Sequence, residues 1–136
     1  MREITRERGL IDTSVVIELE RIDPRRLPGE ATISAVTLAE LAAGPHATED
    51  KNERARRQDR LQRAEAALEP LPVDVAVARA YGRVYAAVAA LGRKARGRRA
   101  FDLLIAATAL AHDLPLYTRN PADFAGLDDL ITVVPT

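Results

Sequence analysis

The sequence predicts an α/β protein in which helices cover a central parallel sheet, and three observations support this fold class. Short apolar segments typical of strands alternate with longer segments whose apolar residues recur at helical spacing. The 136 residues and a hydrophobic fraction of 47% suit one compact core. No repeat, low-complexity tract or linker interrupts the chain, so we expect residues 1–136 to form a single domain.

Five short apolar segments are expected to be strands, and each of the first four is followed by a helical pattern. The strands are expected at residues 9–11, 31–34, 70–74, 114–118 and 130–135. Helices are expected at residues 15–19, 36–43, 50–68, 75–91 and 100–112, with a short helical turn from Asn120 and Pro121 at its first position. Gly44 is expected to end the second helix. This alternation is the signature of parallel strands joined by helical crossovers.

The two amphipathic patterns predict which side chains face the core. In the charged helix 50–68 the apolar positions are Ala55, Leu61, Ala64 and Leu68. In the helix 75–91 they are Val77, Tyr81, Val84, Tyr85, Val88 and Leu91. We expect both sets to pack inward.

Composition excludes several classes of protein. The chain has no cysteine, which excludes disulfides and thiolate metal sites. No apolar run approaches the roughly 20 residues of a membrane span, and the first residues lack the apolar region of a secretory signal. We therefore expect a cytoplasmic protein with no membrane partner.

The charge is formally zero but unevenly distributed. Residues 51–63 and 92–99 are rich in basic side chains, whereas beyond residue 100 Arg119 stands against five aspartates. Basic segments beside an acidic one are typical of a protein that handles a polyanion with carboxylates.

Four acidic residues come from separate segments and are expected to meet beyond the carboxyl ends of the parallel strands. They are Asp12, Glu40, Asp102 and Asp123. Each also has an ordinary structural explanation. Asp12 can cap the following helix, Glu40 can face solvent, Asp102 can answer the helix dipole, and Asp123 can form a capping pair with Asn120. The functional interpretation depends on their joint placement.

Converging carboxylates repel one another, and a bound cation or a proton must relieve that repulsion. Oxygen ligands favour Mg²⁺ or Mn²⁺, and such ions activate water for in-line attack on a phosphodiester. We expect Asp12 and Asp102 to be direct ligands, with Glu40 and Asp123 completing the shell or orienting water. The polar side chains expected to hold waters or a phosphate are Ser14, Thr118 and Asn120.

A basic stretch precedes Asp102 and is expected to contact the phosphates of RNA. Its members are Arg93, Lys94, Arg96, Arg98 and Arg99. The alternative is a solvated charged loop with no ligand. His46 and His112 show no ligand or triad spacing, and we expect both to be structural or surface residues.

The segments "LIDTSVVI", "ISAVTLAEL" and "FDLLIAATALAHDLPLYTRNPADF" together resemble the PIN domain family, and more narrowly the VapC toxins of type II toxin–antitoxin systems. The resemblance runs through nearly the whole chain. It implies a three-layer α/β/α PIN fold and a Mg²⁺- or Mn²⁺-dependent endoribonuclease that uses Asp12, Glu40, Asp102 and Asp123. It also implies a homodimer and a cognate VapB-like antitoxin that inhibits the nuclease, often by placing an arginine at the acidic cluster.

Two other functions are compatible with parts of the pattern. A phosphatase with an aspartyl nucleophile commonly has a second aspartate two residues after the first, where this chain has Ser14. A non-catalytic module of PIN fold would bind RNA or a protein partner through the basic segments. Such a module would keep its binding when the acids are replaced and would show no metal-dependent cleavage.

Overall fold

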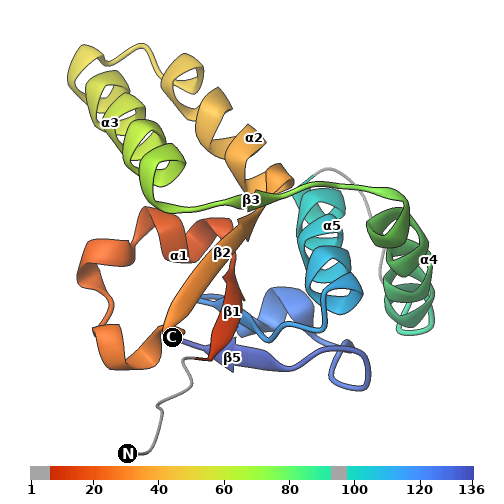
Figure 1. Cartoon of the computed structure of the whole chain (residues 1–136). Helices are drawn as coiled ribbons and strands as arrows, with labels where there is room; N and C mark the ends of the chain where they lie inside the picture. Colours follow the sequence, from red (N-terminus) through yellow and green to blue (C-terminus); the bar gives the residue numbers. More distant parts are fainter. Residues whose placement is uncertain (1–6, 93–97) are drawn as a thin grey trace, which may run out of the picture.

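A computed structural model of the chain describes residues 7–92 and 98–136 (Figure 1). At its centre lies a five-stranded sheet in the order β3-β2-β1-β4-β5, and every neighbouring pair is parallel. The strands are β1 (Arg8–Ile11), β2 (Glu30–Ser34), β3 (Pro70–Leu71), β4 (Leu116–Thr118) and β5 (Val133–Pro135). The predicted parallel α/β architecture is therefore confirmed.

Helical segments connect the strands. The α-helices are α1 (Thr13–Ile17), α2 (Ala35–Ala43), α3 (Lys51–Ala67), α4 (Val75–Ala89) and α5 (Arg98–Ala111). Short 3₁₀ segments are η1 (Leu19–Arg21), η2 (Pro24–Arg26), η3 (Gly44–Ala47) and η4 (Pro121–Phe124). Figure 1 shows α2 beside α3 on one side of the molecule and α4 beside α5 on the other. None of the helices within the described ranges is long and apolar enough to cross a membrane.

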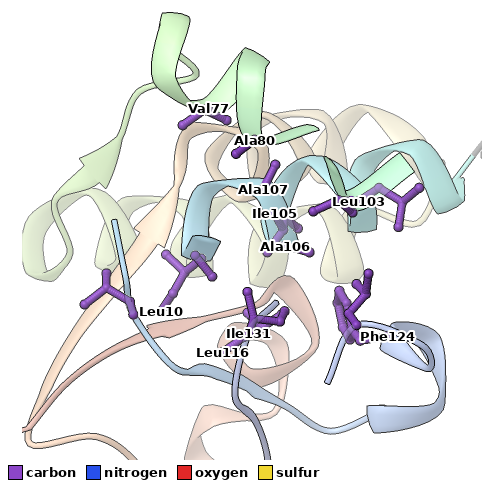
Figure 2. Close-up of a cluster of buried hydrophobic side chains, with 14 of the residues drawn as sticks. Leu10, Val77, Ala80, Leu103, Ile105, Ala106, Ala107, Leu116, Phe124 and Ile131 are labelled. Atoms are coloured by element: carbon purple, nitrogen blue, oxygen red, sulfur yellow. The ribbon is translucent and has the colours of Figure 1, made fainter. Parts of the chain in front are cut away.

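The sheet separates two hydrophobic clusters because successive strand residues point to opposite faces. Leu10 belongs to a cluster with residues of α4, α5 and η4, whereas its neighbour Ile11 belongs to a cluster with residues of α1, α2 and α3. Leu116 and Tyr117 on β4 divide in the same way. The sheet is thus the middle layer of an α/β/α arrangement, and Figure 2 shows the first cluster.

Helix α5 is the central helix of that first cluster. Leu103, Ile105 and Ala106 are at most 1% exposed. One face of the helix also carries Thr108, whose hydroxyl lies 2.8 Å from the Leu104 carbonyl and 3.3 Å from Ser34 Oγ at the end of β2. The small and branched aliphatic side chains let α5 lie close to the sheet.

Close packing also explains a glycine at the start of the sheet. A Cβ atom on Gly9 would lie 2.5 Å from Tyr117 Cε1 and 2.9 Å from Pro28 Cβ. Both distances are below van der Waals contact, so a side chain at position 9 would have to displace the Tyr117 ring and Pro28.

Helix α2 ends as predicted, with Gly44 as its C-cap; Gly44 is right-handed (φ −51°, ψ −49°) and leads into η3. Other details of the sequence prediction are wrong. Ala55 and Tyr85 are exposed, because the packed stripes of α3 and α4 are narrower than the apolar pattern. Leu91 is exposed because α4 ends at Ala89, before it reaches this residue. Helix α5 begins at Arg98, two residues earlier than expected.

Candidate active site

A cavity of about 610 Å³ opens where β1 and β4 end and α1 and η4 begin. This is the edge at which sites form in parallel sheets, because the loops after neighbouring strands meet there. The lining residues are Asp12, Thr13, Ser14, Glu40, Asp102, Arg119, Asn120, Pro121, Ala122 and Asp123. The structure therefore brings all four predicted acids together, although they are up to 111 residues apart in sequence.

Asp12 is the most deeply placed acid, with 5% of its surface exposed. It directly follows β1 and is the N-cap of α1, where its Oδ1 accepts a hydrogen bond from the Val15 amide (3.2 Å). The same oxygen accepts from the Ser14 hydroxyl, and Oδ2 accepts from the Thr118 hydroxyl (2.6 Å). Asp12 therefore does cap α1, but capping accounts for only one of the three hydrogen bonds that its carboxylate accepts.

Ser14 and Thr118 also join the two loops that form the cavity. The Arg119 amide donates to Ser14 Oγ (3.2 Å), and the Asn120 amide donates to Thr118 Oγ1 (3.0 Å). Ser14 lies in the cavity wall, whereas Thr118 is fully buried behind Asp12. These hydroxyls therefore hold the carboxylate and the chain after β4 in one arrangement.

Glu40 reaches the cavity from α2, which follows β2. It is half-buried, and its Oε1 accepts a hydrogen bond from the Thr13 hydroxyl (2.7 Å). The ordinary explanation, a glutamate that faces bulk solvent, is wrong. The sequence did not single out Thr13, because nothing local to it indicates a contact with a glutamate 27 positions away.

Asp102 lies half-buried on α5 and lines the same cavity. Because α5 begins at Arg98, Asp102 is its fifth residue, and the first turn of the helix holds no acid. The field of a helix dipole acts mainly on the first turn. The helix dipole therefore does not explain this carboxylate.

Asp123 differs from Asp12 in being exposed. It sits in η4, for which Asn120 is the N-cap residue, but the Asn120 side chain makes no capping hydrogen bond. The contact between the two residues is from the Asp123 amide to the Asn120 carbonyl (3.0 Å). The suggested side-chain capping pair is absent, and both side chains line the cavity instead.

The donor set suits a hard divalent cation, because all four acids supply oxygen. Within residues 7–92 and 98–136, no three acidic or histidine side chains are close enough to form a ready-made ligand cage. Mg²⁺ usually takes one or two carboxylates and keeps several waters, so it does not need such a cage. The residues present fit a cation held partly through water. His46 and His112 are exposed and do not line the cavity.

The predicted RNA-binding residues are mostly beyond what the structure describes. Arg93, Lys94 and Arg96 lie outside the described residues, as does the side chain of Arg98. Arg99 is half-buried near the start of α5 and does not line the cavity. Among the described residues, the basic one that lines it is Arg119, whose role the sequence did not indicate beyond its charge.

Known proteins provide an independent comparison. The PIN domain family matches residues 9–130 of this chain. A protein named Ribonuclease VapC5, from Mycobacterium tuberculosis, is 38% identical over 128 residues, which are 92% of this chain and 91% of the relative. A protein named Ribonuclease VapC, from Rickettsia bellii, is 29% identical over 89% of this chain and 91% of its own length.

Solved structures agree with this comparison. The M. tuberculosis structure described as VapBC-5, a member of the VapBC family of toxin–antitoxin systems, superposes with a TM-score of 0.83. It is 37% identical and covers 95% of this chain and 98% of that chain. VapBC-1 from Haemophilus influenzae superposes with a TM-score of 0.71 at 23% identity over 94% and 97% of the two chains, which supports the fold.

Proposed function

The chain belongs to the PIN domain family, and from this membership and the acidic cavity we propose that it is a metal-dependent endoribonuclease, the toxin of a type II toxin–antitoxin pair. One observation carries the proposal. Four carboxylates from four separate segments line a single open cavity at the carboxyl end of a parallel sheet. The ribonuclease names of relatives that align over about nine-tenths of this chain support the same reaction.

We assign the acids to the binding of a divalent cation, with Mg²⁺ preferred and Mn²⁺ as a substitute. Asp12 and Asp102 are the proposed direct ligands, and Glu40 and Asp123 complete the shell or orient water. Such an ion supplies charge neutralisation at the phosphodiester and a water of lowered pKa. The protein's part is to hold the carboxylates in place. The hydrogen bonds from Ser14 and Thr118 to Asp12 do so for the most buried one.

Positively charged residues around the cavity are suited to the RNA backbone. Arg119 lines the cavity beside the acids, and one of its guanidinium nitrogens donates to the Thr136 carbonyl (3.3 Å). A guanidinium has five N–H donors, so most remain for phosphate oxygens. Ser14 and Asn120 add polar groups in the wall of the cavity. The basic segment that ends at Arg99 includes the first two residues of α5 and is proposed to extend this contact.

We propose a VapB-like antitoxin as the physiological inhibitor and a homodimer as the assembly. The antitoxin is supported by a similar structure that is described as a member of the VapBC family of toxin–antitoxin systems. The homodimer is proposed from the family resemblance alone. A cationic side chain from such a partner would satisfy the carboxylates of the cavity through charge-assisted hydrogen bonds. It would then compete with both the metal ion and the RNA.

The test is cleavage of a structured RNA mixture by antitoxin-free protein, with Mg²⁺, with Mn²⁺ and with chelator, beside Asp12→Ala and Asp102→Asn. We expect discrete cuts that require the metal and disappear in both variants. RNA that is bound but never cut, with binding unchanged in both variants, would favour the alternative function of a non-catalytic binding module. Cleavage that survives in chelator would contradict the proposed metal.

A further inference from the structure

Two buried threonines connect the start of α1, which follows β1, to α2, the helix that carries Glu40. Thr13 directly follows Asp12, and Thr37 lies three residues before Glu40 on α2. Thr13 is 8% exposed and Thr37 is fully buried. Thr13 Oγ1 lies 2.7 Å from Glu40 Oε1 and 3.0 Å from Thr37 Oγ1, so it sits between the other two groups.

The direction of these hydrogen bonds follows from the number of protons available. An ionised carboxylate can only accept a hydrogen bond, and a hydroxyl has one proton to donate. Thr13 must therefore donate to Glu40 and accept from Thr37. The Thr37 hydroxyl thus donates to Thr13, and the Thr13 hydroxyl donates to the Glu40 carboxylate. Each hydroxyl has a single orientation in this arrangement.

We propose that Thr13 and Thr37 are positioning residues that aim the Glu40 carboxylate into the cavity. Thr13 holds Oε1, while no hydrogen bond from the described residues reaches Oε2. Oε2 is then free to bind the metal ion or one of its waters. This inference rests on the proposed function of the cavity, and it adds two residues and a reason for their chemistry.

The hydrogen bond from Thr13 restricts the conformation of the Glu40 side chain. A glutamate side chain has several rotatable bonds, and fixing it in one conformation has an entropic cost that a hydrogen bond must offset. Thr13 begins α1 after β1 and Glu40 lies on α2 after β2, so the bond ties together the helices that follow two adjacent strands. Ser14 and Thr118 orient Asp12 in the same manner. Hydrogen-bond partners of this kind strengthen metal sites.

The test compares three substitutions by titrating the antitoxin-free protein with Mn²⁺ in a calorimeter. Thr13→Val keeps the shape and removes the donor, so we expect Mn²⁺ affinity to fall about 10- to 100-fold. Thr13→Ser keeps the hydroxyl and should bind Mn²⁺ almost as tightly as the wild type. Thr37→Val leaves Thr13 able to donate, and we expect a loss of less than about 10-fold.

If Thr13 and Thr37 only stabilise the fold, the variants should rank differently in Mn²⁺ affinity. Thr37 is the more deeply buried of the two, so Thr37→Val should lower Tm at least as much as Thr13→Val. If Mn²⁺ affinity simply follows Tm across the variants, the inference fails. A second check repeats Thr13→Val in a Glu40→Ala background, where it should cause no further loss of affinity, because the group it positions is missing.

Cleavage and metal binding are measured separately, so the two proposals can fail separately. If the wild-type protein binds Mn²⁺ but cuts no RNA, the proposed ribonuclease function fails. The positioning role of Thr13 and Thr37 is then still tested by the Mn²⁺ titration. If the folded Thr13→Val variant cleaves RNA at the wild-type rate and binds Mn²⁺ with unchanged affinity, only the proposed positioning role of the threonines fails. A wild-type protein that binds no Mn²⁺ would overturn both.

Discussion

The two sides of the cavity differ in how firmly they hold their carboxylates. On the side of β1 and β2, the oxygens of Asp12 and the Oε1 of Glu40 accept hydrogen bonds from buried or half-buried groups. On the side of η4, Asp123 is exposed, and none of the hydrogen bonds among the described residues ends on its side chain. On the first side the carboxylates are oriented by hydrogen bonds without any ligand, whereas on the second side Asp123 is exposed to solvent.

This difference indicates a division of labour between the two sides. Carboxylates that are already oriented need little reorganisation when a cation binds. An exposed carboxylate keeps its hydration and its freedom, so it can adapt to a cation, its waters and an RNA strand of variable shape. Substitutions on the first side should therefore affect folding and activity together, whereas those on the second should affect activity alone.

The largest expected effect comes from comparing Asp12→Asn with Asp102→Asn. Both should abolish metal-dependent cleavage. Asp12→Asn should also destabilise the fold by about 1–3 kcal/mol, because an amide NH₂ would face hydroxyl or amide donors at a buried position. Asp102→Asn should lose less stability than Asp12→Asn, because Asp102 is half-buried rather than buried. Urea unfolding beside an RNA cleavage assay measures both, and equal stability of the two variants would contradict the distinction.

Thr118→Val tests whether the buried hydroxyl behind Asp12 orients it. The valine keeps the shape but leaves Asp12 Oδ2 and the Asn120 amide without their partner. We expect a loss of about 1–3 kcal/mol in the free energy of unfolding and about 10- to 100-fold in cleavage rate. The matched control is Thr132→Val at an exposed position, which should change stability by less than about 0.5 kcal/mol. Wild-type cleavage by Thr118→Val would show that Asp12 needs no such support.

Asp123→Asn addresses the open side. Because Asp123 is exposed, the free energy of unfolding should change by less than about 0.5 kcal/mol. Cleavage should fall, but less than for Asp12→Asn, since an adaptable ligand is partly replaced by water. Raising the Mn²⁺ concentration should restore part of the rate. A variant that unfolds as readily as Asp12→Asn would remove the contrast between the two sides.

The smallest expected effect concerns Asp50, which caps α3 and does not line the cavity. The backbone amides of Glu53 and Asn52 donate to its carboxylate and hold its pKa below the usual range. A lowered pKa in the folded state stabilises the fold above the unfolded pKa of about 3.9, and this stabilisation is lost as the pH falls through the folded value. Asp50→Ala should therefore lower Tm slightly at pH 7 and less at pH 3. Cleavage at pH 7 should be unchanged, which separates helix capping from the second role proposed for Asp12.

Sequence patterns predicted most of the elements because periodicity and capping are local properties. The apolar run before Asp12 is β1, and the small aliphatic residues around Ala106 form the buried face of α5. The same locality explains the errors. Tyr85 follows the helical period, yet it is exposed, because the width of the packed stripe depends on which neighbours α4 meets. Leu91 follows the same period, but α4 ends at Ala89.

For the candidate site, the sequence by itself determined which carboxylates are available and that each lies after a strand or on a helix near the sheet edge. Only the tertiary structure decided their surroundings. The strand order β2-β1-β4 places Thr13 beside Glu40 and Ser14 beside Arg119, across 27 and 105 residues of chain. Hydrogen bonds of this kind depend on how distant loops meet after the sheet has formed. No local pattern of residues encodes them.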